Sequence, residues 1–209
     1  MSTILGDVIE SLRKDGRGKV FVSKDFLHLG SRDAIDQALS RLARNKTVHR
    51  LARGLYWYPK TNRRLGIHLS PSPDQIAHAL ARRTGTKVAP SGAVAANRLG
   101  LSTQVPTRPV YLTNGRSREI QVGDQVFVMR HVPAKSFPDG NPMSTAVIQA
   151  LKFLGPEAVD DSLINELRRR LNISQRKQFL SDARYASDWI AAVARKVAAD
   201  TKSLGSVDG

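Results

Sequence analysis

Residues 31–59 restrict the possible folds of this chain more than any other stretch. The segment "SRDAIDQALSRLARN" has a helical pattern with four apolar residues on one face: Ile35, Ala38, Leu39 and Leu42. Ser31 stands where an N-cap belongs. Two β-prone pieces follow, "TVHRLA" and "GLYWYP", joined at Arg53-Gly54, where glycine permits a tight turn. The segment therefore predicts a helix with one packed and one free face, followed by a two-stranded ribbon.

The residues before this segment complete a familiar order of elements. Residues 3–14 carry apolar side chains at helical spacing, residues 19–23 are β-prone, and "KDFLHLG" suits a brief helix with Ser23 as its cap. Helix, strand, helix, helix and ribbon is the order of elements in a winged helix-turn-helix. In that fold, the second helix of the helix-turn-helix motif enters the major groove of DNA, and the ribbon, or wing, contacts the flanking backbone. We therefore predict a DNA-binding winged helix-turn-helix in residues 1–62.

The charge of the chain favours a polyanionic partner. The sequence has 33 Lys and Arg against 18 Asp and Glu, which gives a formal net charge of +15. Residues 1–65 hold 14 basic and 6 acidic residues, whereas residues 139–209 hold 10 and 9. The excess thus lies in the part that contains the predicted winged helix. An anionic membrane surface and a generally basic, solvated surface are the two alternatives.

The free face of the predicted helix and the ribbon carry groups that suit double-stranded DNA. Arg32 can pair with guanine and Gln37 with adenine in the major groove. Further along the helix and on the ribbon, the arginines are better placed for phosphate. The predicted DNA-binding residues are Ser31, Arg32, Gln37, Ser40, Arg41, Arg44, Lys46, His49, Arg50 and Arg53.

Other roles stay open for some of these side chains and for the aromatic residues beside them. Arg41 can instead pair with Asp36 along the helix, and His49 can be a packing or surface residue. The aromatic residues 56–58 could stack on unpaired bases, but neighbours on a strand alternate faces, which favours packing against the helices.

The rest of the chain predicts a mixed domain and a helical end. Residues 61–73 are rich in polar residues, Gly and Pro, so we expect a linker or domain boundary there. A helix that begins at Ser72-Pro73-Asp74, a strand "KVAP" and a helix "SGAVAANRLG" lead into "PVYLTN", "REIQV" and "QVFVMRHVP", which suggest an antiparallel meander. Four helical patterns follow, with Asp160, Ser174 and Ser187 as N-caps.

The predicted fold class is therefore α+β. We expect a winged helix-turn-helix domain in residues 1–62 and a central α+β domain in residues 70–138. A C-terminal helical segment in residues 139–202 would pack on the central domain.

Sequence signals for catalysis are few. The chain has no cysteine, no phosphate-binding glycine loop and no histidines at metal-ligand spacing. Glu119 and Asp124 could hold Mg²⁺ as in a metal-dependent nuclease, although turn and edge-strand acids are the simpler interpretation. We expect a protein that is not an enzyme and uses no cofactor or metal. No stretch is long and apolar enough to span a membrane, so we expect a cytoplasmic protein with no membrane partner.

Two stretches resemble the AbiEi family of antitoxins from type IV toxin–antitoxin systems. In "SRDAIDQALSRLARNKTVHRLARGLYWYP", the family pattern of A-L-x-R-L, a basic turn, an apolar-arginine-apolar strand and G-h-Y falls at residues 38–42, 48–51 and 54–56. In "PSGAVAANRLGLSTQVPTRPVYLTNGRSREI", the pattern S-G-x-x-A-x-N-x-L-G-L-S-T-Q-V-P runs from Ser91 to Pro106. The matches lie in the family's order and cover about half of the chain.

The resemblance implies a bacterial antitoxin that represses its own operon through inverted repeats, as a dimer on DNA. It also implies that the protein counters a nucleotidyltransferase-like toxin and that DNA binding and antitoxin activity are separate. The alternative is an antitoxin or interaction module that works mainly by direct binding of a protein partner.

Overall fold

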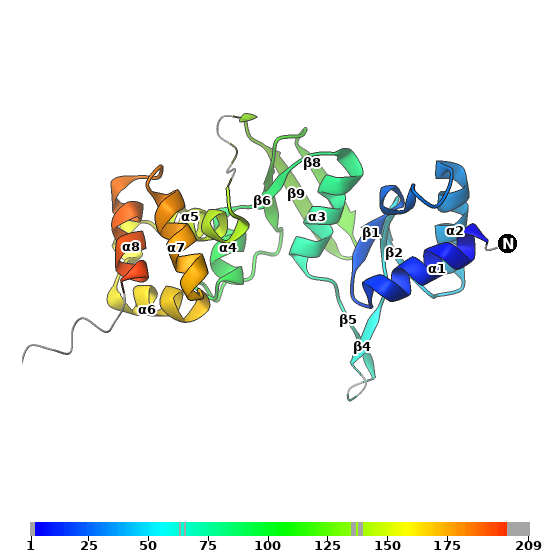
Figure 1. The fold of residues 1–209 in the computed structure, drawn as a ribbon, viewed down its shortest axis with the longest axis horizontal. Helices are drawn as coiled ribbons and strands as arrows, with labels where there is room; N and C mark the ends of the chain where they lie inside the picture. Colours follow the sequence, from blue (N-terminus) through cyan, green and yellow to red (C-terminus); the bar gives the residue numbers. More distant parts are fainter. Residues whose placement is uncertain (1–2, 63, 65, 135–136, 138–139, 200–209) are drawn as a thin grey trace, which may run out of the picture. The chain divides into compact units, whose positions relative to one another are not determined.

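A computed structural model of the chain describes residues 3–62, 64, 66–134, 137 and 140–199 (Figure 1). The fold is a mixed α+β fold, as predicted. The chain forms two compact units, and each is described by itself. Unit 1 consists of Met1–Val88 and Thr113–Pro133, and unit 2 consists of Ala89–Leu112 and Ala134–Gly209. The three-part division into 1–62, 70–138 and 139–202 stays a prediction.

The first part of unit 1 has the element order and sheet topology of a winged helix. The elements are α1 (Ile4–Asp15), β1 (Val20–Val22), the 3₁₀ helix η1 (Ser23–Phe26), α2 (Arg32–Arg44), β2 (His49–Ala52) and β3 (Leu55–Trp57). The strands form an antiparallel sheet in the order β1-β3-β2, so the last strand lies in the middle. The hairpin β2–β3 is therefore the wing, and α2 occupies the position of the recognition helix.

Local capping explains where these helices begin. The side chain of Thr3 accepts a hydrogen bond from the amide of Gly6, and that of Ser31 accepts one from the amide of Ala34. The prediction that Ser23 caps the short helix is wrong. Ser23 lies inside η1, and the helix begins instead with the amide of Val22 donating to the carboxylate of Asp25 at 3.0 Å.

The aromatic residues 56–58 pack in the interior, as expected from their alternation. All three are at most 7% exposed. Tyr56 stacks on Phe21 and lies, with Tyr58, in the core between the sheet, α1 and α2. Trp57 points to the other face, where its ring meets that of His49. The sheet is thus buried on both faces.

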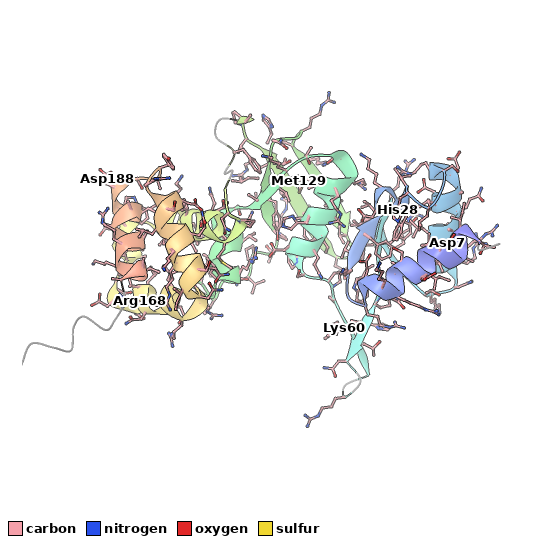
Figure 2. The ribbon with its side chains drawn as sticks, in the orientation of Figure 1. Asp7, His28, Lys60, Met129, Arg168 and Asp188 are labelled. Atoms are coloured by element: carbon pink, nitrogen blue, oxygen red, sulfur yellow. The ribbon has the colours of Figure 1, made fainter. Side chains whose placement is uncertain are left out.

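The prediction of a linker at residues 61–73 is wrong at residues 61–62 and 67–69, which form strands. β4 (Lys60–Asn62) and β5 (Ile67–Leu69) form an antiparallel hairpin that starts at Lys60 and projects from the unit (Figure 2). The hydroxyl of Thr61 lies 3.1 Å from Nδ1 of His68 across the two strands. Lys60 and Asn62 are residue types that are depleted in strands, so β4 depends on cross-strand pairing that local sequence does not reveal.

Helix α3 (Pro73–Thr84) begins where predicted and covers β1. Ser72 and Gln75 form a reciprocal capping box, with bonds of 3.3 Å and 2.9 Å. At the other end, Arg82 donates to both carboxylate oxygens of Asp25 at 3.0 Å and to the carbonyl of Val20 at 3.0 Å. These bonds tie α3 to the winged helix and make both parts of one unit.

The predicted strands form, but in an order that differs from a simple meander. They are β6 (Val88–Pro90), β7 (Val110–Thr113), β8 (Arg118–Val122) and β9 (Gln125–His131). The sheet order is β6-β7-β9-β8, so β9 rather than β8 lies beside β7. The hairpin β8–β9 is antiparallel, with Arg118 opposite Met129.

Unit 2 is built mainly of helices around an apolar core. They are α4 (Gly92–Arg98), α5 (Pro142–Leu154), the 3₁₀ helix η3 (Pro156–Ala158), α6 (Asp161–Arg170), α7 (Ile173–Ala183) and α8 (Asp188–Ala198). Large apolar side chains such as Leu151, Leu167 and Phe179 are fully buried among them.

The N-caps of these helices are partly as predicted. Asp160 accepts from the amide of Leu163 at 2.8 Å, and Ser187 occupies the N-cap of α8. The prediction for Ser174 is wrong, because Asn172 caps α7 and forms a capping box with Gln175 at 2.9 Å in both directions. In the part of the chain that the structure describes, no helix has both the length and the apolar character needed to cross a bilayer.

Candidate nucleic-acid interface

Helix α2 presents a polar, basic face to solvent. Its buried face consists of the four predicted apolar residues, Ile35, Ala38, Leu39 and Leu42. The side chains on the other face are exposed, and they include Ser31, Arg32, Gln37, Ser40, Arg41 and Arg44. Because positions 37, 41 and 44 are separated by one helical turn each, they form a stripe along the helix. A stripe of this kind on a recognition-type helix can contact bases and phosphates of one groove.

At the start of α2, before this stripe, Arg32 forms an ion pair with Asp36. Nε of Arg32 donates to Oδ2 of Asp36 at 2.8 Å, and both side chains are about half exposed. Partial burial acts to raise the pKa of Asp36, but the nearby hydroxyl of Ser23 and the hydrogen bond and charge of Arg32 hold it below the usual value. Asp36 therefore pairs with Arg32 and not with Arg41, the pairing considered from the sequence. The bond uses Nε and leaves the Nη groups of Arg32 outside it.

Just beyond α2, the chain turns sharply at Lys46. Lys46 has a φ of 56°, the one positive φ at a non-glycine residue in the described part of the chain. The turn is closed by the amide of Thr47, which donates to the carbonyl of Leu42 at 2.9 Å. The exposed ammonium of Lys46 therefore projects from the corner between the recognition helix and the wing.

On the wing, two predicted contacts are exposed and one is not. Arg50 and Arg53 are exposed, and Gly54 makes the turn with a φ of 68°. Arg50 lies opposite Tyr56; burial raises the pKa of this tyrosine, and the charge of Arg50 lowers it by a smaller amount. His49 is only partly exposed, and its ring lies 5.4 Å from those of both Trp57 and His68, centroid to centroid. This position favours a packing role for His49.

Two arginines near the wing turn were missed from the sequence. Nη1 of Arg83, at the end of α3, donates to the carbonyl of Arg53 at 2.6 Å, and Nη2 of Arg118 donates to the hydroxyl of Thr84 at 2.9 Å. Burial, followed by the charge of Arg118, lowers the pKa of Arg83. Both contacts join residues 30 or more positions apart, so no local pattern could have revealed them.

The acidic and histidine residues do not form a metal site within the described residues. Glu119 lies near the start of β8, whereas Asp124 lies in the turn after that strand, so the two carboxylates are at opposite ends of it. In the described ranges, no three His, Asp or Glu side chains gather in a way that could hold a metal ion.

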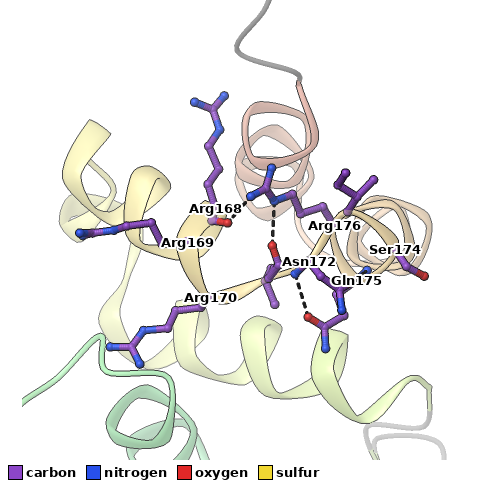
Figure 3. A pocket seen from close by; sticks show the side chains of 9 residues that line it. Arg168, Arg169, Arg170, Asn172, Ser174, Gln175 and Arg176 are labelled. Atoms are coloured by element: carbon purple, nitrogen blue, oxygen red, sulfur yellow. Dashed lines mark hydrogen bonds between the residues drawn. The ribbon is translucent and has the colours of Figure 1, made fainter.

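Unit 2 contains an open, arginine-lined pocket of about 780 Å³ between the end of α6 and the start of α7 (Figure 3). Its arginines have structural partners. Arg168 donates to the carbonyl of Lys196 in the last turn of α8, and Arg176 donates to the carbonyls of Arg168 and Leu171 at the end of α6. Arg169 and Arg170 both pair with Glu166, and the hydrogen bond from Arg170 is the main cause that lowers the pKa of that carboxyl. The pocket is thus a junction of helix ends.

Comparisons with known proteins match a family model and a solved structure. A model for a family described as of unknown function, DUF6088, matches residues 7–179. The crystal structure of the Rv2827c protein from Mycobacterium tuberculosis is 16% identical, with a TM-score of 0.45, and the match covers 95% of this chain and 77% of that chain. No curated protein matches the sequence.

Proposed function

The chain belongs to the DUF6088 family, whose function is unknown, and from that starting point we propose that it is a sequence-specific, double-stranded DNA-binding transcriptional repressor. The observation that carries the proposal is the exposed basic stripe of α2 next to a wing that exposes Arg50 and Arg53. Together they offer one helix for the major groove and one hairpin for the flanking backbone, the division of contacts that a winged helix uses.

In this proposal, the residues of the interface have different tasks. Arg32 and Gln37 contact base edges, where a good bidentate pair is worth about 1 to 3 kcal/mol of discrimination. Arg41, Arg44, Lys46, Arg50 and Arg53 contact phosphates, and Ser31 and Ser40 complete the polar edge of the helix. The high positive charge of residues 1–65 supports this assignment, because phosphate contacts supply most of the sequence-independent affinity.

We further propose that the repressor is a cytoplasmic antitoxin that regulates its own operon as a dimer on inverted repeats and antagonises a nucleotidyltransferase-like toxin. It would act by binding and not as an enzyme, and without cofactor or metal. This part depends on the resemblance of two stretches to the AbiEi antitoxins, above all on the motif from Ser91 to Pro106.

Binding to the protein's own upstream DNA tests the repressor role. Fluorescence anisotropy at moderate salt should give tighter binding to the promoter region of its own gene than to a random duplex of equal length. Specific sites are typically preferred by about 10³-fold or more over non-specific DNA. Equal affinity for the two duplexes would reject sequence-specific repression.

Exposed apolar side chains on α7 favour a protein partner as the second candidate function. Ile173 is 64% exposed and Leu180 is 38% exposed, and seven residues separate them, so they share one face of the helix. Co-purification with the product of the neighbouring gene, and its loss in Ile173→Asp, would support direct antitoxin binding. A chain that purifies alone when both genes are expressed together would count against it.

A further inference from the structure

A hydrogen bond joins the main chain of the wing turn to a side chain of α3. Nη1 of Arg83 donates to the carbonyl of Arg53 at 2.6 Å. A Cβ placed on Gly54 would lie 3.9 Å from Cδ of Arg83, so the stem of this arginine also lies against the turn. Because the bond uses a carbonyl, the side chain of Arg53 stays available to solvent. The guanidinium of Arg83 therefore lies against the main chain of the wing turn, which also carries the exposed side chain of Arg53.

A second guanidinium, that of Arg118, lies near Arg83. Nη2 of Arg118, on β8, donates at 2.9 Å to the hydroxyl of Thr84, the residue that follows Arg83. The same hydroxyl lies within hydrogen-bond distance of the carbonyls of Leu80 and Ala81, so Thr84 is held in place by its own helix. Nε of Arg118 is buried and has no hydrogen-bond partner within the described structure.

The local electrostatics of this arginine group are unfavourable for the protein alone. The hydrogen bonds that hold Arg83 and Arg118 end on a carbonyl and a hydroxyl, which carry no net charge. Partial burial and the neighbouring charge of Arg118 both lower the pKa of Arg83. Two like charges held together in a partly desolvated place gain most from an anion that reaches both. The planar guanidinium group suits a phosphate oxygen pair in particular.

We infer that Arg83 and Arg118, together with Arg53, form a phosphate-binding site beside the wing turn, which extends the DNA contact from the winged helix onto α3 and β8. The inference rests on the proposed function, because the ligand is the phosphate backbone of the same duplex. A winged helix alone would end its contact at the wing. In this protein, Arg83 on α3 and Arg118 on β8 supply the next positive charges along the DNA backbone.

The second hairpin of the unit, β4–β5, lies at the other end of β3 from the wing turn. The wing turn precedes β3 and the hairpin β4–β5 follows it, so the two lie at opposite ends of that strand. The β4–β5 hairpin therefore lies away from the wing turn, whereas Arg83 contacts that turn directly.

The test is the salt dependence of binding to a random-sequence duplex, measured by fluorescence anisotropy for the full chain. Each phosphate contact contributes about 0.9 to the slope of log affinity against log salt concentration. Arg118→Gln should reduce the slope by about 0.9 and weaken binding several-fold at low salt. Arg118→Lys, which keeps the charge, should keep most of the slope. Arg83→Gln should resemble Arg118→Gln.

Arg130→Gln is the matched control. Arg118 lies opposite Met129 on β9, so the exposed side chain of the next residue, Arg130, points to the other face of the same sheet (Met129 is labelled in Figure 2). The variant removes one positive charge from the same sheet and should leave the slope unchanged. Circular dichroism melting verifies that each variant is folded at the assay temperature.

The outcomes separate this inference from the proposed function. If the wild-type chain binds duplex DNA but Arg83→Gln and Arg118→Gln keep its full slope, the extended site is rejected and the winged-helix interface stands. If Arg130→Gln loses as much slope as they do, the effect is one of total charge, and the extended site is also rejected. If the wild-type chain does not bind DNA at all, both proposals fail together.

Discussion

Nε of Arg32 lies 2.8 Å from Oδ2 of Asp36, one turn further along α2. The contact places an acid on the face of the helix that we propose to meet DNA, where phosphate would repel it. It also restricts the orientation of the guanidinium before DNA arrives, which lowers the entropy lost when this arginine binds a base. Arg32 and Asp36 thus act as one unit, and substitutions of the two residues have different expected effects.

Arg32→Ala should relax base specificity. We expect discrimination at one base pair of the operator to fall by about 1 to 3 kcal/mol, because a bidentate contact to guanine is lost. Protein stability should change by no more than about 0.5 kcal/mol, since the ion pair is exposed. Competition binding with operators that carry single base changes measures the effect. Arg13→Ala, at an exposed site on α1, is the control, and an unchanged preference in Arg32→Ala would remove this residue from base recognition.

Asp36 should make stability depend on pH in the acid range. The pKa of its carboxyl is lowered in the folded protein from an ordinary value of 3.8, so its stabilising contribution is present above that value. The contribution is lost as the pH falls through the lower, folded-state pKa. Urea unfolding of wild type and Asp36→Asn should therefore differ near neutral pH and converge as the pH falls below the folded-state pKa. A difference that stays constant with pH would contradict a lowered pKa.

Arg50→Ala and Arg53→Ala should each weaken binding to every duplex by a similar factor. Each variant is expected to reduce the salt slope by about 0.9, with no change in the ranking of DNA sequences. Arg53→Ala keeps its main-chain carbonyl and hence the hydrogen bond from Arg83, so the wing turn should stay in place. Anisotropy titrations over a range of salt concentrations measure the slope. A sequence-dependent loss would show that the wing contacts bases.

Trp57→Ala should destabilise the protein more than it affects DNA binding. The side chain is 5% exposed and packs against His49 and His68, so its removal should cost about 3 to 5 kcal/mol of unfolding free energy. Chemical denaturation gives this value. Trp57→Phe should cost less, because the indole Nε1 is buried without a hydrogen-bond partner in the described structure. If Trp57→Ala kept its stability and lost DNA affinity, a base-stacking role would replace packing.

Asn172→Ala should destabilise unit 2, whereas Ser174→Ala should not. The side chain of Asn172 accepts the hydrogen bond from Gln175 that starts α7, and loss of such a cap costs about 0.5 to 2 kcal/mol. Ser174 is exposed within the first turn, so its replacement should stay within about 0.5 kcal/mol. Thermal unfolding of the two variants compares them directly. The reverse order would restore Ser174 as the cap.

Features set by neighbouring residues could be predicted from the sequence. The apolar face of α2, the cap at Ser31, the capping box at Ser72 and the turn at Gly54 all depend on interactions over a few positions. The winged-helix topology followed from the order of these elements, since few arrangements of that order bury every apolar face. The exposed candidate residues of α2 followed from helical periodicity alone.

Features that depend on contacts between residues distant in the sequence could not be predicted from it. The β4–β5 hairpin forms because the two short strands pair with each other, and β9 lies beside β7 although β8 precedes it in the chain. Asp36 had Arg32 four positions before it and Arg41 five positions after it, and only the packed structure determined that Arg32 holds it.

The sequence by itself therefore determined an α+β chain with a winged helix and a basic helix face, because periodicity, capping and charge are local properties. The tertiary structure alone decided what surrounds that face. Arg83 is 30 positions from Arg53, and their contact exists only because α3 packs on the sheet that carries the wing. Long-range hydrogen bonds and side-chain burial arise from the packing of whole elements, which no short window of sequence contains.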